Sequence, residues 1–580
     1  MSIELMAPVS NNDTLIAALS SGADSVYLGY KEFNARIVAD NFTNHELEDA
    51  IKLIHEKGKK GYLVFNTLLK DSEFERAITY LNFAIDIGVD GIIIQDLGII
   101  NWLRNKPVPL FASTQMTICN SRGVNIAKLM GFKRVVLARE LNINDIASVS
   151  EKTKGIELEC FIHGGLCIGY SGQCAASTIF EHCAANRGIC KTPCWEDYAL
   201  YCDNQLVYSG KIIKPKDMYA IHHISRLNEM GISALKIQGR SRSVSYVTNV
   251  VKVYREYIDF LENDNHQYFS QEKLDILKNQ SPRGLMKGNL ELSINNDFVV
   301  HSKPCFFPAL SDLPYGKCEA CRIPEHITVS FTSLENIVPD QLFKGIERIY
   351  LSYDLLIEEN KTKILKLSKI ASLYMIIPIL IERYDVSAEY IERKCFEYNI
   401  SGISISNVGD LLLINKIDCE FSAERSLNIC NVSSANYLKD FGIKMISLPF
   451  ELQESEMIYL SNNVDLKFER TVYGRPKLIQ MKYCILTKSN ECLEHCEKCK
   501  EYKKIILSGK KSFIASINPS RTETTLYPYK RISMPIWKED VYYTRLEFTD
   551  ETIDHINHVL ASYHNGFYFC GEYIDSIGSI

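Results

Sequence analysis

The chain has 580 residues, which is long enough for two or three domains, each with its own core. Its apolar fraction of 46% and charged fraction of 23% are those of an ordinary globular protein and exclude extensive disorder. A formal charge of −6 excludes a global attraction to nucleic acid, so an RNA partner would need a local basic patch.

The start of the chain indicates the cellular compartment. Residues Met1–Pro8 have neither the basic start nor the apolar core of a signal peptide, and no apolar run is long enough to span a bilayer. We therefore expect a cytoplasmic protein with no membrane partner. Because disulfides are rare in a reducing compartment, the 19 cysteines argue for metal, cluster or redox chemistry.

The first 240 residues alternate short apolar runs with helix-like segments, as repeated βα units do around a parallel sheet. Eight strands are predicted, at Glu4–Val9, Ser25–Gly29, Gly61–Phe65, Gly91–Gln95, Leu110–Thr114, Arg134–Ala138, Leu158–His163 and Ala234–Gln238. Eight strands close a TIM barrel, so residues 1–262 are predicted to be a (β/α)8 barrel of the α/β class. The long connection before the last strand predicts an insertion at about 164–210.

A second region repeats the first. Gly91–Ile94 aligns without a gap to Gly402–Ile405, and the same offset matches Ile118–Asn120 with Ile429–Asn431. We expect a degenerate barrel-like half at 326–511, after a linker region at 263–325 and before a small C-terminal segment at 512–580.

The second copy lacks several polar residues of the first. Gln115 becomes Ser426 and Arg139 becomes Phe450 at the same offset. The first barrel is therefore the predicted place of catalysis.

The insertion carries four cysteines, Cys167, Cys174, Cys190 and Cys194, among several glycines. Thiolates bind soft metals, and four of them on a wrapping loop suit a four-iron cluster. Structural zinc usually uses two short cysteine pairs, and only Cys190 and Cys194 are close here. A thiol nucleophile beside a histidine is a further alternative. The spacing favours an iron–sulfur cluster over zinc.

A second group of cysteines lies where the repeat would have its own insertion: Cys484, Cys492, Cys496 and Cys499. Zinc and a second iron–sulfur cluster are equally compatible with that spacing.

The motif Glu159-x-Phe-x-His163-Gly-x-Leu-Cys167, followed by Tyr170-Ser-Gly-x-Cys174 and Asn186-Arg-Gly-x-Cys190, resembles the signature of the collagenase-like peptidase family U32. The resemblance covers the first 260 residues and, more weakly, the second half with Arg545–Thr549. It implies a TIM-like barrel with a 4Fe-4S cluster on the four cysteines of the insertion.

The resemblance also implies an activity. Similar members hydroxylate pyrimidines of RNA without dioxygen, several with prephenate as the hydroxyl source, while others hydroxylate a ubiquinone precursor or are described as proteases. Two positions depart from the family pattern. The pattern usually has Glu where this chain has Gln238, and it usually has a basic residue within the terminal stretch that here reads Gly566–Cys570.

Polar residues that follow barrel strands are predicted to form the site, because TIM barrels place their chemistry at the carboxyl ends of the strands. Strand alternation predicts that Glu159 and His163 face one side of the sheet, where Glu159 is either catalytic or part of an internal ion pair with Arg139 or Lys236. The predicted catalytic residues are His163, Glu159, Gln115, Arg139 and Lys236, and the predicted substrate contacts are Arg187, Arg240 and Tyr170.

The preferred hypothesis is an iron–sulfur enzyme that hydroxylates a pyrimidine in tRNA or rRNA. A peptidase acting on peptide substrates is the competing class, although no Ser-His-Asp set, zinc-protease motif or paired aspartates has recognisable spacing. A non-catalytic maturation or scaffold subunit is a third reading. The sequence leaves the oligomeric state open.

Overall fold

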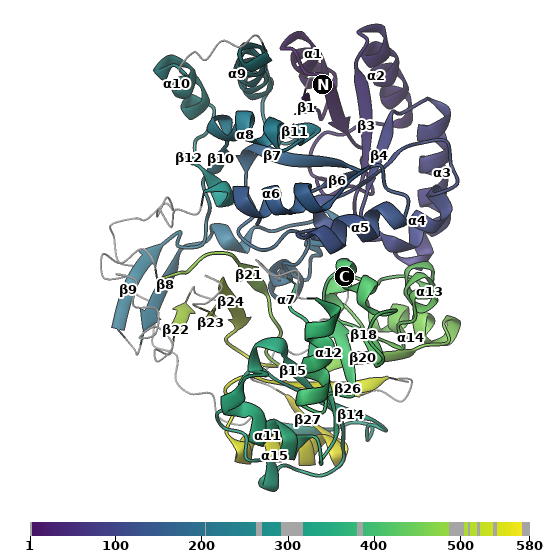
Figure 1. Ribbon diagram of the computed structural model, residues 1–580, viewed down its shortest axis with the longest axis vertical. Coiled ribbons are helices and arrows are strands. Elements are labelled where there is room, and N and C mark those ends of the chain that lie inside the picture. The colour runs from purple at the N-terminus through teal and green to yellow at the C-terminus, as the bar shows by residue number, and fades with distance from the viewer. Residues whose placement is uncertain are drawn as a thin grey trace.

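The computed structural model describes residues 3–202, 205–262, 269–291, 317–379, 387–486, 504–507, 511–518, 523–536 and 542–570. Two closed parallel barrels, each surrounded by helices, make up most of this part of the chain (Figure 1). The predicted α/β fold with TIM-like barrels is confirmed. None of the described helices combines the length and the apolar character that a membrane span requires.

The first barrel has the eight predicted strands, with ends that differ by a few residues. They are β1 (Glu4–Pro8), β2 (Ser25–Leu28), β3 (Lys60–Phe65), β4 (Gly91–Ile94), β5 (Leu110–Ala112), β6 (Arg134–Val136), β7 (Glu157–Gly165) and β11 (Ala234–Ile237). Because β11 pairs in parallel with both β1 and β7, the sheet closes.

The helices around this barrel form from amphipathic segments with local caps. In α2 (Asn44–Glu56), Thr43 and Glu46 form a capping box, and one apolar stripe packs against the sheet. The other helices of this half are α1 (Asn12–Ser20), α3 (Phe74–Asp86), α4 (Leu97–Leu103), α5 (Ser121–Leu129), α6 (Ile143–Lys152), α7 (Ala176–Glu181), α8 (Ile224–Glu229), α9 (Val244–Glu262) and α10 (Gln271–Asn279).

The second half is a complete barrel. Its strands are β14 (Ile327–Phe331), β15 (Ile346–Ser352), β16 (Ser372–Ile376), β17 (Gly402–Ile405), β18 (Glu420–Ala423), β19 (Met445–Ser447), β20 (Lys467–Gly474) and β26 (Tyr543–Phe548). β26 pairs with β14 and β20, so the terminal part of the chain supplies the strand that closes this barrel. Its helices are α11 (Glu358–Leu367), α12 (Ala388–Glu397), α13 (Val432–Phe441), α14 (Glu454–Asn463) and α15 (Ile553–His564).

Smaller strands lie outside the two barrel rings. β10 (Asp217–Tyr219) pairs with β7 and with β12 (Leu285–Met286), which lies inside the predicted linker region. β13 (Lys317–Ala320) pairs with β27 (Phe567–Cys570). β25 (Ile532–Ser533) pairs with the end of β20.

A third sheet joins the insertions of the two barrels, which the sequence did not predict. β8 (Tyr198–Cys202) and β9 (Gln205–Gly210) come from the first insertion. β21 (Ile479–Met481), β22 (Lys504–Leu507), β23 (Phe513–Asn518) and β24 (Glu523–Pro528) come from the second half. The strands run in the order β21-β24-β23-β22-β8-β9 with antiparallel neighbours, so the sheet beside the barrels in Figure 1 is built from both halves.

The two barrels meet through equivalent segments of the repeat. Asn120 caps α5 and its repeat partner Asn431 caps α13. The Asn431 side chain also donates to Asp96 Oδ2 of the first barrel at 2.9 Å, and Asn407 of the second barrel donates to the Thr117 carbonyl at 2.8 Å. The interface is therefore approximately two-fold symmetric.

Glycine at one repeated position allows this close approach. A Cβ on Gly98 would clash with Asn431 Oδ1 and lie 2.9 Å from the Ser434 backbone nitrogen, and one on Gly409 would lie 2.6 Å from the Gly123 nitrogen. Real Cβ atoms do not approach backbone atoms this closely, so a larger residue must push the barrels apart.

We expect Gly98→Ala to lower the free energy of unfolding by about 1–3 kcal/mol, because the added methyl group overpacks the interface. Chemical denaturation followed by circular dichroism measures this change. Asn101→Ala on the exposed face of the same helix is the control and should change stability by about 0.5 kcal/mol or less. Equal stability of the two variants would contradict the proposed packing constraint.

Candidate functional site

The mouth of the first barrel is closed by the cysteine loop, which we define as residues 164–194. Ser171 donates its backbone N–H to Glu140, and its carbonyl accepts from Thr117 Oγ1 at 2.6 Å. The Asn186 carbonyl accepts from the Leu68 backbone N–H at 3.1 Å. These contacts bind the loop to the ends of several strands, so it fills the space in which the sequence had placed the site.

The four predicted cluster ligands come together on this loop and are free cysteines. Burial and then repulsion from Cys167, Cys190 and Cys194 raise the pKa of Cys174 well above its ordinary value. The Thr192 backbone N–H donates to Cys190 Sγ at 3.4 Å. Four neighbouring thiols that repel one another as thiolates are a donor set that a cationic centre would stabilise.

The donor set and its placement bear on the kind of centre these thiols suit. Within the described residues, no group of three or more His, Cys, Asp or Glu side chains is placed so that it could hold a metal ion. Four cysteines on one loop are the kind of donor set that iron–sulfur clusters use.

The cysteine loop also contacts the insertion of the second barrel. The Tyr170 backbone N–H donates to the Gln480 carbonyl at 2.8 Å, and the Ala175 N–H donates to the Leu478 carbonyl at 2.9 Å. The Tyr170 hydroxyl donates to Glu523 at 3.0 Å. Tyr170, a predicted substrate contact, is thus buried in an interdomain contact, and Cys174 reaches the mouth of the second barrel.

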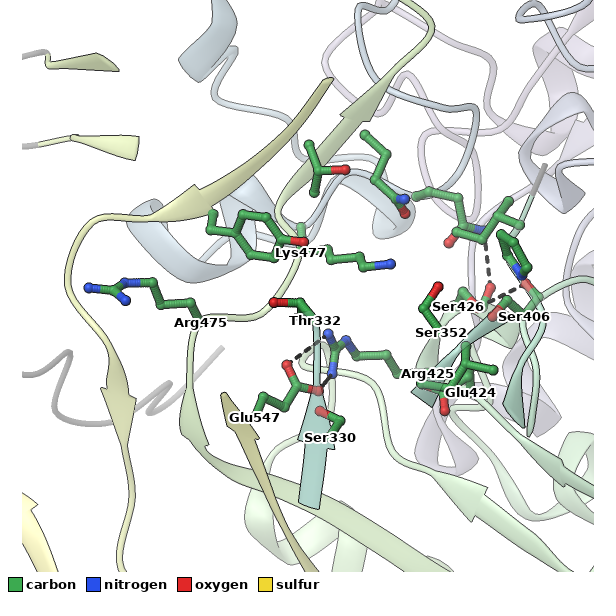
Figure 2. Close-up of a pocket in the computed structure, with 18 of the residues that line it drawn as sticks. Ser330, Thr332, Ser352, Ser406, Glu424, Arg425, Ser426, Arg475, Lys477 and Glu547 are labelled. Carbon is green, nitrogen blue, oxygen red and sulfur yellow. Dashed lines mark hydrogen bonds and ion pairs between the residues drawn. The ribbon is translucent and has the colours of Figure 1, made fainter. Parts of the chain in front are cut away.

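A cavity of about 820 Å³ lies at that mouth (Figure 2). Residues at or just beyond the carboxyl ends of all eight strands of the second barrel line it, and the cysteine loop contributes Gly172–Ala175. This is the face on which TIM barrels carry their sites. The structure therefore locates the large cavity over the second barrel, whereas the sequence had favoured the first.

Charged side chains in and behind the cavity wall form three ion pairs, which a contact between Arg545 and Glu547 at 3.6 Å connects. Arg545 is buried and contacts Glu424 at 2.9 Å and Glu469 at 3.2 Å. Burial alone would raise the pKa of Glu424, but Arg545 and Arg425 hold it below its ordinary value. Arg425 pairs with Glu547 through both guanidinium nitrogens, as the dashed lines in Figure 2 show. The Glu424 carboxylate is thereby held in the ionised form.

Glu547 is the second-barrel counterpart of Gln238. β26 pairs with β20 with the same one-residue shift that β11 has against β7, so Arg545 corresponds to Lys236 and Glu547 to Gln238. The carboxylate that the first copy lacks is present at the equivalent place in the second copy. The stretch Arg545–Thr549 was the sequence signal for this residue, but it was not assigned a role.

Glu159 and Lys236, two predicted catalytic residues, lie in the interior of the first barrel. Lys236 Nζ contacts Glu159 at 2.8 Å, and Arg134 contacts the other carboxylate oxygen at 3.3 Å. The ion pair considered from the sequence is thus present with Lys236, and Arg134 takes the place considered for Arg139. Burial lowers the pKa of Lys236 while the Glu159 carboxylate opposes that shift.

The prediction that His163 faces the same side as Glu159 was wrong. The pairing of β7 with β11 shifts by one residue between Phe161 and His163, so a bulge turns His163 outward toward α9. There its Nδ1 lies 3.2 Å from the Tyr254 hydroxyl. Burial lowers the pKa of His163 to about 3, so the ring is neutral at physiological pH.

The other predicted site residues make structural contacts outside the cavity. Arg187 pairs with Glu73 at 2.6 Å, Arg139 donates to Ser171 Oγ at 3.1 Å, and Arg240 donates to Asn34 at 2.7 Å. Gln115 lines a small cavity of about 20 Å³ where the two barrels meet. Among the predicted residues that the structure describes, Cys174 is the one that lines the large cavity. In the second cysteine group, Cys492, Cys496 and Cys499 lie outside the described residues, whereas Cys484 is partly buried.

We expect His163 to make the fold acid-sensitive. Because its folded pKa is about 3 and its ordinary value is 6.5, the unfolded state binds the extra proton between these values. Its stabilising contribution is complete above pH 6.5 and falls by about 1.4 kcal/mol per pH unit well below it. Denaturation of the wild type and of His163→Gln at pH 7 and pH 5 measures this effect. Between these pH values the free energy of unfolding should fall less in the variant than in the wild type. An equal loss would contradict a buried neutral histidine.

The fold and the site define a class: a duplicated TIM barrel with a composite cavity between one barrel mouth and the cysteine loop. The model of Peptidase family U32 matches residues 10–296 and 363–512, which is more than half of the chain. The protein belongs to this family.

Relatives in this family have names of two kinds. The chain is 37% identical over 291 residues to tRNA hydroxylation protein P1 of Bacillus subtilis, covering 48% of this chain and 69% of that protein. It is 36% identical over 262 residues to the 23S rRNA 5-hydroxycytidine C2501 synthase of Escherichia coli, covering 44% of this chain and 39% of that protein. It is 34% identical over 310 residues to an uncharacterised protease of Methanocaldococcus jannaschii, covering 51% and 75%.

Proposed function

We propose that this protein is an iron–sulfur enzyme that hydroxylates a pyrimidine base in tRNA or rRNA, with the cavity over the second barrel as its active site. The observation that carries the proposal is the position of Cys174, which belongs to the predicted cluster ligands and lines the same cavity as Arg425 and Glu547. The names of the Bacillus subtilis and Escherichia coli relatives support RNA hydroxylation as the reaction class.

In this proposal Cys167, Cys174, Cys190 and Cys194 hold a 4Fe-4S cluster. With all four irons bound by cysteine, the cluster would supply electron transfer. Gly164, Gly172 and Gly188 of the loop adopt positive φ angles, and a Cβ at each would clash with a backbone carbonyl of the first barrel half, so they let the loop lie close to that barrel.

The residues of the second barrel then act on the base. Replacing a ring hydrogen by a hydroxyl group requires that a proton leave the ring, and the carboxylate of Glu547, which pairs with Arg425, is the proposed acceptor. Arg425 and the Thr471 hydroxyl at 3.3 Å hold this carboxylate in place. The oxygen comes from a hydroxyl donor other than dioxygen, which is reduced by the two electrons that the C–H bond loses. For this donor the family resemblance implies prephenate.

The cavity size is compatible with a nucleotide taken out of its stack. Its volume of about 820 Å³ lies within the range of roughly 300–1,000 Å³ found for small-molecule sites. Enzymes that modify a base generally extrude it from the helix and stack it on an aromatic side chain. Phe450, whose ring carries the Arg425 guanidinium at 5.1 Å, is the proposed stacking surface.

The name of the Methanocaldococcus jannaschii relative favours a peptidase as the second candidate. The described residues that line the cavity include Ser330, Ser352 and Ser426 but no histidine that could activate a serine. A peptide-library digest with anaerobically purified protein tests this candidate directly.

Nucleoside mass spectrometry of tRNA and rRNA from a deletion strain tests the hydroxylase. We expect one hydroxylated pyrimidine to disappear and to return with the wild-type gene. Glu547→Gln should restore it about 10²-fold more slowly, because the proposed proton acceptor is neutral. Glu420→Gln, at the amino end of the same barrel, is the matched control and should restore it fully. RNA that is unchanged in the deletion strain would rule out this function.

Protein isolated under nitrogen should contain about four iron atoms at the first cysteine group. Replacing all four ligands by serine should remove this iron, because serine is a poor ligand for iron–sulfur clusters. Cys183→Ser, on the same loop, is the control and should keep it. Iron analysis and absorption spectroscopy measure the result, and iron retained by the fourfold variant would exclude these ligands.

A further inference from the structure

One cationic side chain in the wall of the large cavity has no direct partner among the described residues. The other cationic side chains of its wall are paired: Arg425 with Glu547, Arg475 with Asp550, and Arg545 with Glu424 and Glu469. Lys477 makes no ion pair or hydrogen bond with the described part of the chain, although it lines the same cavity.

The backbone holds Lys477 firmly in this position. The next residue, Leu478, donates its N–H to the Leu526 carbonyl and accepts from the Ala175 N–H, both at 2.9 Å. The chain is thus fixed by β24 on one side and by the cysteine loop on the other. Figure 2 shows the Lys477 side chain extending into the cavity toward the hydroxyl of Ser352.

The repeat explains how a lysine came to this place. Gly474 and Gly164 both have positive φ and lie at equivalent places near the ends of β20 and β7, so counting onward places Lys477 at the position of Cys167. The first copy has a thiol there and the second copy an ammonium group. The second copy therefore offers a positive charge to the cavity where the first offers a ligand to a soft metal.

The nearby carboxylates do not serve as partners for this ammonium group. Glu523 already accepts from the Tyr170 hydroxyl at 3.0 Å and from Gln480 at 3.2 Å. Lys477 is exposed to the solvent of the cavity. The protein packed around it lowers its pKa, an effect that Glu523, Glu424 and Glu547 oppose and Arg425 increases. An anion that enters the cavity can therefore reach this ammonium group and form a charged hydrogen bond with it.

We propose that Lys477 and Ser352 form an anion-binding subsite that holds a phosphate or carboxylate group of the substrate. The Ser352 hydroxyl makes no hydrogen bond within the described residues and lines the same cavity, where it supplies a second donor. The proposal rests on the proposed function only in taking this cavity as the substrate site. The anion is either the phosphate of the bound nucleotide or the carboxylate of a small co-substrate.

Calorimetric titration of the anaerobically purified full chain tests the subsite. The probes are cytidine 5′-monophosphate, cytidine and malonate, which separate the phosphate, the nucleoside and a carboxylate. We expect Lys477→Gln to weaken binding of an anionic probe by roughly 10- to 100-fold, the effect of losing one charged hydrogen bond. Cytidine should bind the wild type and this variant equally.

Two further variants separate charge from folding. Lys477→Arg keeps the positive charge and should retain most of the affinity for the anionic probe. Lys444→Gln makes the same charge change at an exposed position at the start of β19, on the opposite end of the barrel, and should leave binding unchanged. Binding to the wild type should also weaken with added salt, and less so in Lys477→Gln.

The outcomes distinguish this proposal from the proposed function. If Lys477→Gln removes only the higher affinity of the monophosphate relative to cytidine, the anion is the phosphate. If Lys477→Gln removes only malonate binding, the anion is a carboxylate. If cytidine and its monophosphate bind equally well to every variant, and malonate binding also does not change, the subsite is overturned. The cavity would then still be a nucleoside site. Malonate binding that depends on Lys477 without any cytidine binding supports the subsite and counts against RNA as the substrate.

Discussion

The docking of the cysteine loop between the two barrels is the constraint on which the site depends. Ser171 bonds to the end of the first barrel, while Tyr170 and Ala175 pair with backbone of the second insertion. A loop held on both sides cannot serve one barrel without affecting the other. It lies across the first mouth and forms part of the wall of the cavity over the second.

The duplicated barrels share a scaffold but use it differently. Each has a buried glutamate beside a buried cation, Glu159 with Lys236 in one and Glu469 with Arg545 in the other. Burying such charges is tolerable only when each is paired, and in both barrels the pairs lie in the interior. The difference arises at the mouth, where the second copy adds Glu547 to the network and remains open to a cavity.

Much of the fold followed from local pattern. Eight apolar runs in the first half, and the constant offset from Gly91 to Gly402, predicted both barrels because strand periodicity and repeats are properties of neighbouring residues. The bulge before His163 was missed, because one extra residue in a strand leaves the apolar pattern nearly unchanged but reverses the direction of the side chain. The shared sheet was missed because its strands pair across more than 300 positions of sequence.

The sequence by itself determined the barrel class, the repeat, the family resemblance and the four cysteines as a set. Only the tertiary structure decided which barrel mouth is open, because that depends on how the cysteine loop packs across the interface of the two halves. Residues such as Lys477 and Arg425 look like ordinary surface charges in the sequence. Their place in one cavity results from contacts between distant segments, which local spacing does not encode.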